Sequence, residues 1–129
     1  MAAMLNILRR GASDQDTEEH ARRPAVALSE ADGALVCKFS GVWVTRTVEV
    51  IDAEMRKLEQ RSDHKGIILD LAGVERVDTA GAWIIDRLVF ANENRRVDAQ
   101  IVNASESATI LIEAVRDAAL KQQRSVRRK

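Results

Sequence analysis

The first folded stretch of the chain has a period of two in its hydrophobic positions. Leu35, Cys37 and Phe39 alternate with the side chains of the opposite face, which predicts a strand. A short apolar run over residues 25–29 precedes this strand, and the Asp32-Gly33 pair between them is the strongest short signal for a hairpin turn. Residues 25–43 are therefore predicted to form a β-hairpin.

The period changes to that of a helix after Thr47. Either Thr45 or Thr47 can cap the start of this helix, and Asp52 and Arg56 form a supportive i,i+4 pair on its surface. Its apolar face consists of Val48, Ile51, Met55 and Leu58. The polar and glycine-containing loop at 62–66 ends it.

Two further strands and two further helices follow. Residues 67–71 form a compact apolar run, typical of a strand covered on both faces, and residues 99–102 predict another short strand. A helix between two such strands indicates a crossover to a parallel neighbour. The helix expected at 80–92 faces inward through Ile84, Ile85, Leu88 and Val89. The last helix, capped by Asn103 or Ser105, buries Ala108, Leu111, Ile112, Val115 and Ala119.

This order, β-β-α-β-α-β-α, predicts an α/β fold: a small sandwich of about three helices on a mixed sheet of about four strands. Residues 1–24 are expected to be a disordered leader, because residues 9–24 show no helical or strand period. The apolar positions within 4–8 would also suit a short docking helix. The folded domain is expected at 25–123. A basic tail at 124–129 fits two readings: a solvated helix end, or a segment attracted to anionic lipid.

The composition of the chain excludes several classes of function. The chain has 20 Lys+Arg and 20 Asp+Glu, and zero net charge argues against general nucleic-acid binding. A single cysteine, Cys37, excludes an internal disulfide framework and a multi-cysteine zinc site, and it suits a reducing compartment. The longest apolar stretch, residues 80–85, is far shorter than the roughly 20 residues of a transmembrane helix. We expect a cytoplasmic domain with no transmembrane segment.

The residues that carry catalysis in other proteins do not come together here. His20 and His64 have no metal or triad spacing, and no phosphate-binding G-x-x-x-x-G-K-[ST] loop is present. Cys37 is interpreted as a buried small hydrophobe, and Asp70 as a residue that caps a loop, because a catalytic acid needs a partner. We therefore expect a protein that is not an enzyme and has no metal or cofactor.

The most informative segment runs from Leu69 to Trp83. Asp78 and Thr79 stand where a helix begins, and either can cap its free backbone N–H groups. Ala80, Gly81 and Ala82 leave the first turn bare, which suggests that another protein approaches the backbone there. Trp83 then has two readings that the residues alone leave open: an exposed anchor for that partner, or a core side chain.

The same segment resembles a known family. The Asp70-Leu71 pair, Val74 and the run Val77-Asp78-Thr79-Ala80-Gly81 are similar to the signature of STAS domains, the fold of sulfate transporters and anti-sigma factor antagonists. The resemblance covers about residues 25–120 and implies a binding module. In the antagonists the residue before the glycine carries a hydroxyl that a kinase-type partner phosphorylates. Here that position is Ala80, so only the neighbouring Thr79 is left as an unfavoured acceptor.

A second branch of the family fits the loop better. Val77-Asp78-Thr79-Ala80-Gly81 is similar to the loop of STAS subunits and domains in lipid-transporting ABC systems (the Mla type). Residues 39–45 (FSGVWVT) also resemble a stretch of permeases that carry a fused STAS domain. The resemblance implies a regulatory component that docks on the ABC ATPase or permease, at the inner face of the inner membrane. An anti-sigma factor antagonist bound to an anti-sigma factor or switch kinase is the alternative. The expected partner-binding residues are Asp78, Thr79, Ala80, Gly81 and Trp83, with Trp43 and Thr45 as weaker candidates.

Overall fold

A computed structural model describes residues 23–127, so the predicted leader (except Arg23 and Pro24) and the end of the basic tail lie outside the described residues. The elements follow the expected order β-β-α-β-α-β-α. The strands are β1 (Ala25–Ala31), β2 (Ala34–Trp43), β3 (Gly66–Val77) and β4 (Asp98–Val102). The helices are α2 (Val48–Gln60), α3 (Thr79–Asn94) and α4 (Glu106–Arg127). The α/β fold class is confirmed.

The four strands form one mixed sheet in the order β1-β2-β3-β4. β1 pairs antiparallel with β2, while β2 with β3 and β3 with β4 pair in parallel through the crossovers α2 and α3. The predicted hairpin turn is present, with positive φ angles of 53° at Asp32 and 84° at Gly33. Two successive positive φ angles match the twist of a two-residue hairpin loop, which explains the Asp-Gly pair.

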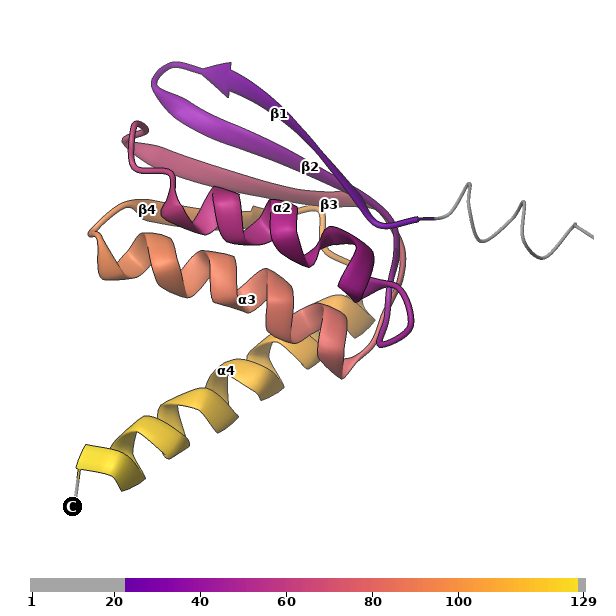
Figure 1. The fold of residues 1–129 in the computed structure, drawn as a ribbon, viewed down its shortest axis with the longest axis vertical. Helices are drawn as coiled ribbons and strands as arrows, with labels where there is room; N and C mark the ends of the chain where they lie inside the picture. Colours follow the sequence, from indigo (N-terminus) through magenta and orange to yellow (C-terminus); the bar gives the residue numbers. More distant parts are fainter. Residues whose placement is uncertain (1–22, 128–129) are drawn as a thin grey trace, which may run out of the picture.

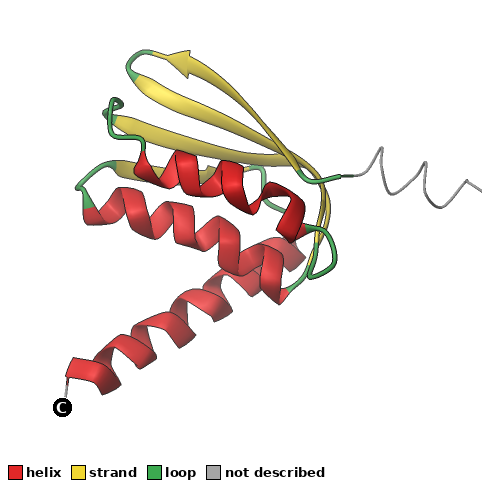
Figure 2. Cartoon of the chain, in the orientation of Figure 1, coloured by secondary structure: helices red, strands yellow, loops and turns green. Residues whose placement is uncertain are grey.

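The helices α2 and α3 lie side by side over one face of the sheet, and α4 crosses beside α3 with its carboxyl end pointing away (Figures 1 and 2). The core fills the space between this helix layer and the sheet. Its largest fully buried side chains include Trp43, Phe39, Leu35, Met55 and Ile67. β3 is therefore covered on one face only: Leu69 is fully buried whereas Ile68 is half-buried, which corrects the expectation of cover on both faces.

β3 is longer than the apolar run predicted. It continues through Val77 because its second half pairs with the end of β2, for example Trp43 with Val77. Two register shifts, at Lys38/Ser40 and Gly41/Val42, interrupt this pairing. Asp70 consequently lies inside the strand, where its Oδ1 accepts hydrogen bonds from Ala72 N (3.0 Å) and from Asn103 Nδ2 (3.1 Å). The loop expected directly after Asp70 is therefore absent, and its carboxylate bonds within β3 and to Asn103 instead of capping a loop of its own.

The helix caps agree with the sequence in part. Ser105 is the cap of α4, through Ala108 N to Ser105 Oγ at 3.1 Å, whereas Asn103 takes a left-handed conformation and bonds Asp70. Thr47 occupies the N-cap position of α2 without a side-chain cap bond, because its hydroxyl donates to Val42 O at 2.6 Å. Thr45 bonds Asp78 instead. Of the two predicted threonines, Thr47 is therefore the N-cap residue of α2, although its side chain makes no capping hydrogen bond.

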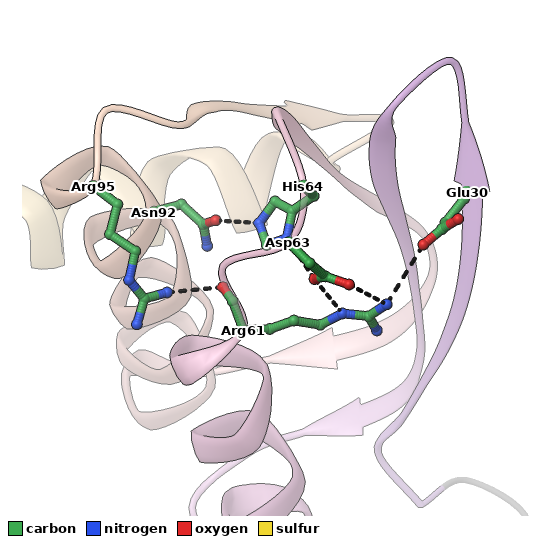
Figure 3. A network of polar contacts seen from close by, with 6 residues as sticks. All are labelled: Glu30, Arg61, Asp63, His64, Asn92 and Arg95. Atoms are coloured by element: carbon green, nitrogen blue, oxygen red, sulfur yellow. Dashed lines mark hydrogen bonds and ion pairs between the residues drawn. The ribbon is translucent and has the colours of Figure 1, made fainter.

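The amino end of β3 and the carboxyl ends of α2 and α3 are held by a polar network (Figure 3). Arg61 pairs with Asp63 at 2.9 Å and with Glu30 of β1 at 3.5 Å, and its carbonyl accepts from Arg95 Nη1 at 2.8 Å. Here too, His64 Nε2 lies 2.6 Å from Oδ1 of the fully buried Asn92. These contacts join β1, α2 and α3.

Candidate functional surface at the start of helix α3

Asp78 lies at the opposite end of the sheet, where β2 and β3 end, and it bonds several backbone groups there. It is the N-cap of α3, and its Oδ1 accepts a hydrogen bond from Gly81 N at 3.1 Å. Its Oδ2 accepts from both the backbone N and the hydroxyl of Thr45, each at 2.9 Å. Its own N–H donates to Trp43 O at 3.2 Å. One carboxylate thus joins the loop before α2 to the first turn of α3.

The electrostatics of Asp78 agree with this geometry. Partial burial by itself raises the pKa of the Asp78 carboxyl, but the hydrogen bonds from Thr45 and Gly81 outweigh it and lower the pKa below its usual value. The positive end of the α3 dipole also favours a carboxylate at this position. Asp78 is therefore ionised at neutral pH and fixed in place.

Thr79 and Trp83 are the residues that this arrangement presents outward. Thr79, the first residue of α3, is exposed, and its hydroxyl makes no hydrogen bond with any other described residue. Trp83 lies one turn later with 44% of its surface exposed. The structure thereby excludes Trp83 as a core side chain, while its role as an anchor for a partner stays a prediction. Asp78, rather than Thr79, is the cap.

Gly81 has a different role from the one expected. It is buried, and a Cβ added there would overlap the carbonyl oxygen of Trp43 and lie 2.9 Å from Trp43 Cβ. The close approach that its missing side chain permits is therefore made by the chain's own β2. Ala82 is fully buried as well, so the bare first turn serves the packing of α3 against the end of β2.

Trp43 is removed from the surface candidates. Its side chain is fully buried, its ring centroid lies 5.0 Å from that of Phe39, and its Nε1 donates to Ser40 O at 2.8 Å. Such a side chain contributes to stability and cannot contact a partner. Thr45, the other weaker candidate, is exposed and adjoins Asp78, so the structure brings it together with Thr79.

Cys37 is held in a structural position. Burial raises the pKa of the Cys37 thiol to about 11, so it is protonated at neutral pH and unreactive. Within residues 23–127 no group of three or more His, Cys, Asp or Glu side chains could hold a metal ion. In the same part of the chain, no helix is both long and apolar enough to cross a membrane.

Two features of the surface were missed from the sequence. The first is Phe90, which is 44% exposed and lies on the same face of α3 as Trp83; its spacing of seven residues was the available signal. The second is the pair formed by Asp86 of α3 and Arg116 of α4, 30 residues apart in the chain, for which no local signal exists.

A family model described as "STAS domain" matches residues 25–117. The chain belongs to the STAS domain family. A search of curated proteins finds no match. Among solved structures, the STAS domain of an antisigma-factor antagonist from Rhodobacter sphaeroides is 17% identical, with a TM-score of 0.55 over 65% of this chain and 94% of that chain.

Two other solved structures share this fold. The phosphorylated form of the Bacillus cell fate determinant SpoIIAA is 17% identical, with a TM-score of 0.54 over 70% of this chain and 83% of that chain. The murine anion transporter Solute Carrier 26 family member A9 is 18% identical, with a TM-score of 0.53 over 72% of this chain but 18% of that chain. Identities this low show a shared fold alone.

Proposed function

We propose that this STAS domain is a non-catalytic protein-interaction module whose partner surface is centred on Thr79 and Trp83. The observation that carries the proposal is the exposure of a large aromatic side chain one turn after an exposed threonine, on a helix start fixed by Asp78. Buried tryptophan anchors are frequent energetic centres of protein interfaces. Thr45 and Ala80 complete the surface at its edge.

The partner that we favour is the ATPase of a lipid-transporting ABC system, at the cytoplasmic face of its membrane complex. Two features support this choice: the Val77–Gly81 loop, which resembles that of STAS components in such systems, and the alanine at position 80. In this role the domain supports assembly of the transporter and performs no chemistry itself. The permease is the other subunit that it would contact.

An anti-sigma factor antagonist is the second candidate, and the solved structures favour it. The Rhodobacter sphaeroides relative is titled an antisigma-factor antagonist, and its fold is matched over nearly its whole length. The partner would then be an anti-sigma factor or a switch kinase. Phosphorylation separates the two candidates, since position 80 offers no hydroxyl oxygen as an acceptor.

Co-purification of the full chain from its native extract, with its partners identified by mass spectrometry, tests the partner class. Recovery of an ABC ATPase supports the transporter role, while recovery of an anti-sigma factor or switch kinase without an ATPase replaces it with the second candidate. Incubating the chain with a switch kinase and ATP should leave its intact mass unchanged. One stoichiometric phosphate on Thr79 would overturn that expectation.

Thr79→Glu tests the surface itself. A glutamate at this first helical position is locally acceptable, so the thermal melt should stay close to that of the wild type. If the surface is buried against the ATPase, desolvation of the new carboxylate should cost a few kcal/mol and abolish a micromolar contact. Undiminished binding would place the interface elsewhere. A collapsed melting temperature would assign Thr79 a structural role.

A further inference from the structure

The aromatic residues of this chain divide into two pairs. The Phe39 and Trp43 rings contact each other in the core at a tilt of 52°, whereas Trp83 and Phe90 are each 44% exposed on α3. A spacing of seven residues places them on one helix face, about 10 Å apart along the axis. Thr79 lies on that face too, one turn before Trp83. The exposed face of α3 therefore continues the proposed partner surface for two further turns.

Beside Phe90, α3 and α4 enclose a pocket of about 260 Å³. Its apolar wall is formed by Phe90 and, from α4, by Ala119 and Leu120, the last with 46% of its surface exposed. Its polar wall contains Asp86, Glu93 and Arg116. A long side chain with an apolar stem and a polar head matches this combination of walls.

The charges of the pocket specify the sign of that head. Arg116 is shared between two carboxylates, with its Nε 3.2 Å from Asp86 Oδ1 and its Nη2 3.4 Å from Glu93 Oε1. One cation facing two anions leaves an excess of negative charge. Burial raises the pKa of Asp86 above its ordinary value, an effect that the neighbouring Glu93 adds to and Arg116 opposes. A second cation in the pocket would stabilise the ionised carboxylates of Asp86 and Glu93, which share Arg116.

We propose that the pocket between α3 and α4 receives a lysine or arginine side chain of the protein that docks at Thr79 and Trp83. The stem packs on Phe90 and Leu120, and the cationic head reaches the carboxylates of Asp86 and Glu93. This inference rests on the proposed function, because it assigns the same partner to a second contact on the same helix. It also explains why both exposed aromatic side chains lie on α3.

The test measures the affinity of the co-purified partner by calorimetry for variants of the full chain. Phe90→Ala and Leu120→Ala should weaken binding about tenfold or more, and Glu93→Gln should both weaken it and reduce its salt dependence. Val50→Ala and Ile110→Ala are matched controls, because these side chains are 51% and 59% exposed away from the pocket. They should change the affinity less than about twofold, within the near-neutral range of non-interface positions.

The outcomes separate this inference from the proposed function. If Thr79→Glu abolishes binding while Phe90→Ala, Leu120→Ala and Glu93→Gln behave like the controls, the pocket is not a contact and the proposed surface stands. If Thr79→Glu binds normally, the proposed surface itself fails. A thermal melt of each variant shows whether it is still folded. Glu93→Arg provides a second test of the pocket. This charge reversal should weaken binding more than Glu93→Gln, and equal or tighter binding would overturn the proposal.

Discussion

At the carboxyl ends of β2 and β3, Asp78 uses both carboxylate oxygens to fix two loops and leaves Thr79 and Trp83 facing outward. At the amino end of β3, the polar residues do the reverse. There His64 turns inward to the buried Asn92, and its Nδ1 is buried without a hydrogen-bond partner. At the first end the polar contacts leave Thr79 and Trp83 exposed beside them, whereas at the second they turn inward and join β1, α2 and α3.

The difference shows which end of the sheet can tolerate change. In open α/β sheets, loops that follow the carboxyl ends of parallel strands are the usual binding positions. At the Asp78 end, Thr45, Thr79 and Trp83 are exposed, so they contribute less to the core than the buried residues behind them. Behind them, however, Gly81 packs so closely on Trp43 that no larger side chain fits there. The exposed residues are therefore held by tightly packed backbone.

Gly81→Ala should have the largest effect on stability, because it disrupts the close packing of α3 on the end of β2. The added Cβ overlaps the carbonyl oxygen of Trp43, so α3 must move away from β2. We expect a loss of about 3 kcal/mol or more in the free energy of unfolding, measured by denaturant titration. Gly66→Ala is the control, since its Cβ would meet Asp98 O at 3.6 Å, an ordinary contact. Equal stabilities of the two variants would show that the Asp78 end is not rigid.

Asn92→Ala tests the other end of the sheet. It removes the acceptor of His64 Nε2 and the side-chain donor to Leu88 O, so the almost fully buried imidazole loses its partner. We expect a loss of about 2 to 3 kcal/mol in the free energy of unfolding, with partner binding unchanged in the folded protein. Asn94→Ala, at an exposed position two residues further on, is the matched control for stability and should change it by less than about 0.5 kcal/mol. Weakened binding by folded Asn92→Ala would contradict the division between the two ends.

The same two ends show what the sequence could predict. A cap at Asp78 or Thr79, the hairpin turn and the helix faces were predicted because each depends on residues within a few positions of one another. Contacts between distant segments could not be predicted this way. The burial of Trp43 against Gly81, the second half of β3 and the pairing of His64 with Asn92 all depend on strand register and helix packing. Trp43 and Gly81 were therefore assigned to the surface, although both are buried.

Asp78→Asn should have the smallest of these effects, and it should depend on pH. Asparagine caps a helix as well as aspartate does. However, it has one acceptor oxygen where Asp78 uses two, so either Gly81 or Thr45 loses its acceptor. We expect a loss of about 1 to 2 kcal/mol at pH 7. Asp70→Asn is the control, because both bonds to Asp70 go to the single oxygen Oδ1, which an amide can keep.

The sign of the pH dependence follows from the lowered pKa of Asp78. A carboxyl whose pKa is lower in the folded than in the unfolded protein contributes stability that is fully present above the unfolded value, about 3.9. That contribution is lost as the pH falls through the folded value. The stability difference between wild type and Asp78→Asn should therefore be constant from pH 7 to about pH 5 and shrink below about pH 4. Other carboxyls titrate in both proteins and largely cancel in the difference. A difference that stays constant down to pH 2 would mean that the charge of Asp78 does not hold Thr45 and Gly81 together, and that shape alone presents Thr79 and Trp83.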